Sequence, residues 1–247
     1  IYDIVDASDP NSWESNGFSQ SSAIEHIRLA MTEYHTKTNI RFVKRTTEFH
    51  YVSIGYFGGG CSSFVGKINI GAQRVTLGWC RSTLGSIIHE FGHALGMWHE
   101  HTRADRDTFL TVPSRANGNF NIANTNSRGI EYDFGSIMHY PLTTGWSTGT
   151  IVMTLTTAGT SRRSEQGNPT IGQRAGLSQL DIDGLATVYP DLGVSRPPTF
   201  PAPTRAPTVV PQVSQGSISV GQTKTGDTRY PGISTIGGAS PDHTYSV

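Results

Sequence analysis

The sequence predicts an α+β fold for residues 1–193, and three kinds of pattern support this prediction. Apolar residues recur at helical spacing over residues 21–35. Short runs of β-branched and aromatic residues follow, separated by segments rich in turn-forming residues. A helix-start signal then precedes residues 179–188. Helices and strands of these lengths can build one buried core and a site beside it.

The first predicted helix covers residues 21–35, where Ile24, Ile27, Met31 and Tyr34 share one face. Strands are predicted over 1–5, 40–43, 51–54 and 74–79, because these runs have the composition of short strands. The glycine cluster at 58–60 is predicted to be a loop, since no phosphate-binding motif surrounds it. A histidine-rich helix is predicted over 84–95.

Little regular pattern is visible between residues 117 and 173, so an irregular lobe is expected there. A last helix is predicted over 179–188 and stops at Pro190. Ser178 and Asp181 have the spacing of a capping box, and Leu177 with Ile182 that of a hydrophobic staple. Asp181 could also be a catalytic carboxylate, but the capping role explains it more simply.

The composition changes after Gly193, where proline, serine, threonine and glycine replace the large apolar residues. Such a segment cannot bury enough surface to order itself. We therefore expect two regions: a folded domain over 1–193 and a Pro/Ser/Thr-rich disordered linker or stalk over 194–247, extended and open to O-glycosylation.

The most informative segment is 89–100, which reads His-Glu-Phe-Gly-His-Ala-Leu-Gly-Met-Trp-His-Glu. His89 and His93 are four residues apart, so on a helix both rings can reach one ion, with Glu90 beside them. His99 is too far along a straight helix to join them. The chain must therefore turn sharply, and Gly96 accepts positive φ at little cost.

These residue types suit one catalytic Zn²⁺. Neutral imidazoles leave the metal most of its charge, which lowers the pKa of a bound water toward about 7 and polarises a carbonyl. Glu90 can take the proton of that water and pass it to a leaving amine. A bare histidine pair at i, i+4 is common on solvated helices, but the full pattern with Glu90, Gly96 and His99 is much rarer.

A second segment, 136–140, reads Ser-Ile-Met-His-Tyr. Together with the zinc motif and its continuation to Asp107, it resembles the astacin family of metzincin endopeptidases, and the resemblance runs from about residue 1 to 189. It implies a metzincin-like, two-lobed catalytic domain with a mixed twisted sheet, the zinc helix above the cleft, and an irregular lower lobe with a C-terminal helix. It also implies that residues 62–66 form the edge strand that pairs with substrate.

The same resemblance implies that Met138 forms a methionine turn, an apolar floor under the three imidazoles. Tyr140 would be a further zinc ligand whose phenol swings away to hydrogen-bond the developing oxyanion. Taken alone, Met138 and Tyr140 would be interpreted as core residues. His101 and His139 adjoin the site and are expected either to orient a ligand or carboxylate or to be structural histidines.

Cys61 and Cys80 are the two cysteines and are compatible with buried thiols or with a bridge. The family resemblance implies a Cys61–Cys80 disulfide, and hence an oxidising, extracellular setting for a secreted protein. It also implies an upstream propeptide and a mature amino terminus that docks near Glu100. Glu100 is therefore expected to need an amino terminus upstream of Ile1, or another partner.

The formal net charge is zero, so neither nucleic acid nor an anionic membrane is an expected partner. No apolar stretch approaches the roughly 18 residues that span a bilayer. The expected partners are protein or peptide substrates.

The expected function is secreted, zinc-dependent endoproteolysis through a zinc-bound water activated by Glu90. One alternative is a catalytically idle, zinc-containing extracellular binding module, and another is a purely structural zinc site, which favours four protein ligands. Glu90 beside three histidines favours the enzyme. Arg174 matches a family segment close to the pocket that follows the cleaved bond, and is predicted to favour an acidic residue there.

Overall fold

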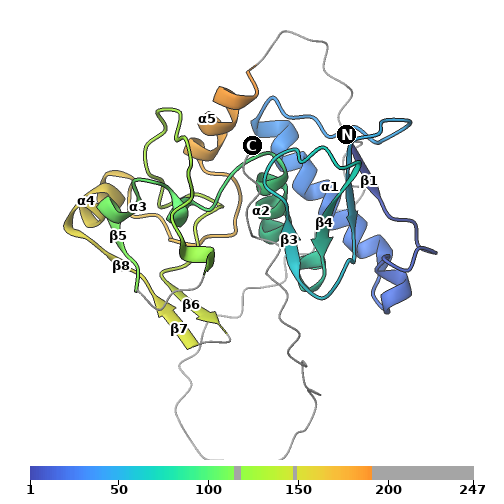
Figure 1. Ribbon diagram of the computed structural model, residues 1–247, viewed down its shortest axis with the longest axis horizontal. Coiled ribbons are helices and arrows are strands. Elements are labelled where there is room, and N and C mark those ends of the chain that lie inside the picture. The colour runs from blue at the N-terminus through green and yellow to red at the C-terminus, as the bar shows by residue number, and fades with distance from the viewer. Residues whose placement is uncertain (114–117, 147–148, 191–247) are drawn as a thin grey trace, which may run out of the picture.

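The computed structural model describes residues 1–113, 118–146 and 149–190, which form two lobes with separate hydrophobic cores. In Figure 1, α1, α2 and the strands β1–β4 make one lobe, α3, α4 and β5–β8 make the other, and α5 lies between them. The α+β class is confirmed. The linker predicted over 194–247 lies outside the described residues. Within the described part of the chain, no helix combines the length and apolar composition needed to cross a bilayer.

The first lobe is built on a mixed, four-stranded sheet in the order β1-β2-β4-β3. Strands β1 (Tyr2–Ile4), β2 (Tyr51–Gly55) and β4 (Ala72–Leu77) are parallel, whereas β3 (Cys61–Ser63) is antiparallel to β4 at the edge. In β4 alternate side chains are buried, ending with Val75 and Leu77 in the core.

Helix α1 (Gln20–Lys37) begins at Ser19, whose side chain accepts a hydrogen bond from the Ser22 N–H. Its buried face includes Ile27, Met31 and Tyr34, as the apolar spacing predicted. The Tyr34 hydroxyl donates to the Ile88 carbonyl at 2.7 Å and so ties α1 to α2 (Leu84–Ala94). This contact fixes the histidine-rich helix against the first core.

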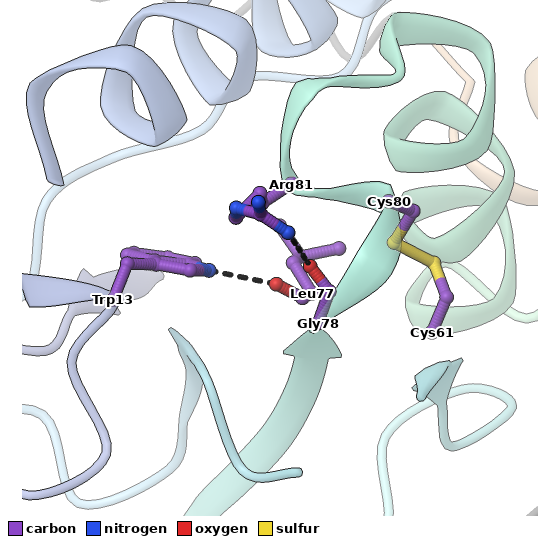
Figure 2. Close-up of a disulfide and its surroundings, with 6 residues drawn as sticks. All are labelled: Trp13, Cys61, Leu77, Gly78, Cys80 and Arg81. Carbon is purple, nitrogen blue, oxygen red and sulfur yellow. Dashed lines mark hydrogen bonds between the residues drawn. A yellow bond between two sulfur atoms is a disulfide. The ribbon is translucent and has the colours of Figure 1, made fainter. Parts of the chain in front are cut away.

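The disulfide implied by the family resemblance is confirmed: Cys61 and Cys80 are bonded, with their Cα atoms 5.9 Å apart. It joins the edge strand β3 to the 3₁₀ turn Trp79–Ser82, which leads into α2 (Figure 2). On the other side of this turn, the buried Trp13 donates its indole N–H to the Leu77 carbonyl at 2.7 Å (Figure 2). The entry to α2 is therefore held from two directions.

Three predicted strands differ from the structure. Residues 40–43 are not a strand, because the Phe42 N–H donates to His35 Nε2 and the Ile40 N–H to Thr38 Oγ1 instead of to a neighbouring strand. The strand predicted over 74–79 ends at Leu77. The edge strand expected over 62–66 is confined to Cys61–Ser63.

The second lobe contains more regular structure than expected. It comprises helices α3 (Arg106–Phe109) and α4 (Thr157–Glu165), with strands β5 (Leu110–Thr111), β6 (Thr143–Trp146), β7 (Gly149–Val152) and β8 (Thr154–Leu155). The pairs β5–β8 and β6–β7 are antiparallel. The prediction of an irregular segment over 117–173 was therefore wrong for α4 and for the strands β6, β7 and β8. Gly159 is the one buried residue of α4, so no apolar stripe marks this helix in the sequence.

The last helix, α5 (Gln179–Val188), has the predicted bounds, and its capping box between Ser178 and Asp181 is present. Ile182 and Leu185 pack into the first core. At its carboxyl end, the Tyr189 hydroxyl donates to the Leu95 carbonyl at 3.0 Å. Helix α5 therefore packs against the chain just after α2.

Candidate metal centre

Helix α2 carries His89, Glu90 and His93, and each of these side chains is buried. The helix also lies close to its neighbours at Gly92, where an added β-carbon would come within 2.7 Å of the Met138 sulfur. The predicted helix is confirmed, except that it ends one residue earlier, at Ala94.

The turn predicted at Gly96 is present, with φ = 97°. The Gly96 N–H donates to the His93 carbonyl and the Met97 N–H to the Gly92 carbonyl, which is the pattern of a Schellman motif. The Gly66 N–H also donates to the His93 carbonyl, at 2.8 Å. This turn sends the chain back so that His99 faces the two helical histidines.

The three histidines converge on one point. His99 Nε2 lies 3.2 Å from His89 Nε2 and 3.1 Å from His93 Nε2. Tetrahedral zinc with Zn–N bonds of about 2.0–2.1 Å places its nitrogen ligands roughly 3.3 Å apart. The spacing of the three nitrogens therefore fits zinc.

The other ring nitrogens show why these Nε2 atoms are available to a metal. His89 Nδ1 lies 2.9 Å from the Ile137 carbonyl, and His93 Nδ1 lies 2.8 Å from the Met97 carbonyl. A carbonyl only accepts, so each Nδ1 carries the proton and each Nε2 presents a lone pair. His99 can donate to at most one of these two lone pairs. A cation at the centre would satisfy all three.

The protonation states agree with this geometry. Burial lowers the pKa of His93 to about 4 and holds the pKa values of His89 and His99 well below the usual value for histidine. Neutral imidazole is the form that binds a metal. Near neutral pH the site therefore needs little proton release before it can bind zinc.

Met138 is fully buried against α2 at Gly92, and its predicted role as a floor under the imidazoles stays a prediction. Its N–H donates to the Ser136 hydroxyl at 3.0 Å, and its carbonyl accepts from the Glu100 N–H at 3.2 Å. The turn around Met138 is thereby linked to the segment that carries His99.

Tyr140 is half-buried and packs beside the metal ligands, with its ring centroid 4.5 Å from that of His99. The His101 ring stacks on Tyr140 at 4.3 Å and on His99 at 5.1 Å. His139 Nδ1 lies 2.6 Å from the Tyr140 carbonyl, and His139 Nε2 lies 2.9 Å from the Tyr132 hydroxyl. His101 and His139 therefore pack behind the site, hydrogen-bonded and buried.

Glu100 is paired with Arg103, whose Nη1 donates to its Oε1 at 3.0 Å, and the Asp133 N–H donates to the same oxygen at 2.8 Å. The sequence left two possibilities for Glu100, an upstream amino terminus or another partner. In this structure Glu100 has another partner, Arg103. Burial raises the pKa of Glu100 to about 8, although Arg103 opposes the shift. Arg103 and Asp133 were not predicted from the sequence; the alternation Arg103-Ala-Asp105-Arg106-Asp107 was the available signal.

Arg174 lies near the site, but its Nη1 donates to the carbonyls of Gln173, Ile137 and His139 at 2.8, 3.1 and 3.2 Å. The Arg174 guanidinium also interacts electrostatically with the side chains of Glu90 and Tyr140. Through these hydrogen bonds Arg174 stabilises the backbone on both sides of Met138, at Ile137 and His139. The predicted role in substrate preference stays a prediction.

Comparisons with known proteins agree with this site. The model of the astacin peptidase family matches residues 12–190. Tolloid-like protein 2 of Mus musculus is 37% identical over 172 residues, which cover 66% of this chain and 16% of that protein. Embryonic protein UVS.2 of Xenopus laevis is 39% identical over 170 residues, which cover 66% of this chain and 31% of that protein. The chain thus spans less than a third of the length of either curated relative.

Among solved structures, high choriolytic enzyme 1, a hatching enzyme zinc-protease from Oryzias latipes, matches with a TM-score of 0.60 and 31% identity. The match covers 76% of this chain and 87% of that one. The fold expected from the family resemblance is therefore confirmed.

Proposed function

Because this chain belongs to the astacin family of zinc metalloendopeptidases, we propose that it cleaves peptide bonds within proteins or peptides at the site of His89, His93 and His99. The observation that carries the proposal is the convergence of three buried Nε2 atoms, two of them oriented by carbonyls at Nδ1. Zinc bound there would act as a Lewis acid that acidifies water and polarises the scissile carbonyl.

Glu90 is the proton carrier in this proposal. Its carboxylate takes a proton from the attacking water while the water oxygen bonds to the carbonyl carbon, and it then gives that proton to the leaving nitrogen as the C–N bond breaks. Glu90 follows His89 on α2 and is buried, which supports a role beside the metal ligands. Its position on a helix, not a loop, keeps the carboxylate in register with both helical histidines.

Tyr140 is proposed to complete the metal site and to hydrogen-bond the oxyanion through its hydroxyl. Its ring packs on His99 and His101, which supports a position at the edge of the site. If the Tyr140 hydroxyl bonds the oxyanion only as its negative charge develops, this hydrogen bond stabilises the transition state more than the bound substrate.

The decisive experiment compares wild type with Glu90→Gln and Glu90→Ala on an unstructured protein such as casein, at equal zinc content. We expect both changes to lower kcat by about 10²–10⁴-fold while zinc stays bound, because general-base catalysis contributes that much. Glu25→Gln, an exposed carboxylate on α1, is the matched control and should be as active as wild type. A chelator should abolish wild-type cleavage.

Two outcomes would contradict the proposal. Zinc-loaded wild type that cleaves nothing would favour the binding-module alternative. Cleavage that survives both Glu90 changes would remove Glu90 from the mechanism.

We further propose that Arg174 favours Asp or Glu just after the cleaved bond. Its charge near Glu90 and Tyr140 supports this role, whereas its bonds to three carbonyls favour a purely structural one. Profiling a peptide library with Arg174→Ala and with Arg163→Ala, an arginine of α4, separates the two. A selective loss of cleavage before acidic residues is expected only in Arg174→Ala; a uniform loss would leave the structural role.

Secretion is part of the proposal, and the Cys61–Cys80 disulfide supports it, because such bonds persist in oxidising compartments. The expected propeptide belongs to the same proposal. Fractionation of producing cells should place the protein in the medium with no thiol that reacts before reduction. A protein retained in the cytosol with free thiols would contradict secretion.

A further inference from the structure

Asp181 makes more contacts than a helix cap requires. A capping box needs its carboxylate to accept the Ser178 N–H, which Oδ2 does at 3.0 Å. The same carboxylate also accepts the Ser136 hydroxyl at 2.7 Å on Oδ1 and the Ile137 N–H at 2.9 Å on Oδ2. These two donors come from a segment 44 or 45 residues away, and Asp181 is only 4% exposed.

Ile137 connects this carboxylate to the metal ligands. Its N–H donates to Asp181, and its carbonyl lies 2.9 Å from His89 Nδ1. The Ile137 side chain is fully buried, and its carbonyl also accepts from Arg174 Nη1 at 3.1 Å, so the residue is held by packing as well as by its backbone contacts. A shift of Ile137 would therefore move the acceptor that keeps the His89 proton on Nδ1 and sets the direction of the ring.

Asp181, in the first turn of α5, is therefore linked to His89 through one residue, Ile137. We propose that Asp181 is a positioning residue, which holds Ile137 so that the Ile137 carbonyl orients His89 for zinc. Asp181 touches neither metal nor substrate in this role. The inference rests on the zinc site of the proposed function but concerns metal affinity, which is measured without proteolysis.

Wild type and three variants of the full chain separate this role from simple capping. Asp181→Ala removes all three accepted bonds. Asp181→Asn can keep them, because the amide oxygen can accept both N–H groups while the NH₂ donates to Ser136 Oγ. Ser178→Ala weakens the helix cap but leaves the Asp181 contacts to Ser136 and Ile137, so it is the matched control for lost stability.

The measurements are the zinc dissociation constant, by competition with a chromophoric chelator, and the visible spectrum of the Co²⁺-substituted protein. We expect Asp181→Ala to bind zinc about 10- to 100-fold more weakly, as is typical when a partner behind a ligand is lost. Its Co²⁺ bands should shift. Asp181→Asn should restore both readouts, and Ser178→Ala should melt at a lower temperature with zinc affinity unchanged.

Two results would overturn the inference: wild-type zinc affinity and Co²⁺ spectrum in Asp181→Ala, or an equal loss of zinc affinity in Ser178→Ala. If Asp181→Ala does not fold, Ser136→Ala replaces it, since Ser136 bonds both Asp181 and the Met138 N–H. Unchanged zinc affinity in Ser136→Ala would then count against the role. Wild type that binds no zinc would refute the proposed function itself, and the positioning role with it.

Discussion

The backbone conformation of Gly96 decides whether His99 can face the two helical histidines. At φ = 97° a side chain is strained, although a β-carbon there would meet nothing closer than the Gly66 Cα at 4.0 Å. We expect Gly96→Ala to lower the free energy of unfolding by about 1–2 kcal/mol and to weaken zinc binding. Urea denaturation and chelator competition measure the two effects.

Gly129→Ala is the matched control, because Gly129 has φ = 82° and no neighbour within 4 Å of an added β-carbon. It should lose similar stability but keep zinc affinity. Equal zinc affinity in both variants would mean that the turn at Gly96 does not set the position of His99.

The sequence predicted the three histidines that converge, but not the groups that orient them. His89 and His93 have helical spacing and the turn at Gly96 brings His99 to them, so the convergence followed from local geometry. The acceptors of His89 and His93 are backbone carbonyls, which have no sequence signature. The Asp181 contact to Ile137 spans 44 residues and depends on how α5 and Ile137 pack in the first core.

At the scale of elements, α1 carries a histidine that should make stability depend on pH. His35 is 7% exposed, and its Nε2 accepts the Phe42 N–H at 2.8 Å, which requires the neutral ring. Burial and the nearby Arg41 lower its pKa. Between that lowered pKa and about 6.5 the unfolded chain binds more protons, so the stabilisation is complete above about pH 6.5 and is lost as pH falls through the folded pKa.

His35→Gln should therefore show a smaller loss of stability than wild type between pH 8 and pH 5, measured by urea denaturation with a chelator present. His26→Gln changes the other histidine of α1, whose Nδ1 lies 2.8 Å from the Ser22 carbonyl of the same helix, and should behave like wild type. An identical pH dependence in wild type and His35→Gln would refute the assignment.

Helices α5 and α4 show what limits prediction of elements from sequence. The capping box before α5 acts within a few residues, so the bounds of this helix could be predicted. Helix α4 has a local cap at Thr156, but it packs mainly through Gly159 and has no apolar face. The 40–43 run had strand composition, yet Phe42 packs on Tyr34 and Phe91, against the first core. Tertiary packing overrode its local propensity.

At the scale of the whole molecule, the metal site lies where the two lobes join. His89 and His93 belong to α2 in the first core, and His99 belongs to the segment that leads into the second lobe. Met138 follows α3 and β5 of the second lobe in the sequence but packs within the first core. Zinc held by these three histidines would therefore cross-link α2 to the connection between lobes.

This arrangement predicts that zinc stabilises both lobes together. A ligand at about 1,000 times its dissociation constant adds about 4 kcal/mol to the free energy of unfolding. For a domain of this size, that corresponds to a fall in Tm on the order of 10 °C when a chelator removes the metal. Differential scanning calorimetry should show one transition with zinc and a lower, broader one without it, reversed by Zn²⁺ but not by Mg²⁺.

His99→Ala is the sharpest variant for this measurement, because it removes the ligand on the connection and leaves α2 intact. Its Tm should resemble that of the metal-free wild type and should respond little to the chelator. His50→Ala, just before β2 and far from the cluster in sequence, should keep the full response. If the chelator lowers the Tm of His99→Ala as much as that of wild type, the stabilising metal is bound elsewhere, and the three histidines do not join the lobes through it.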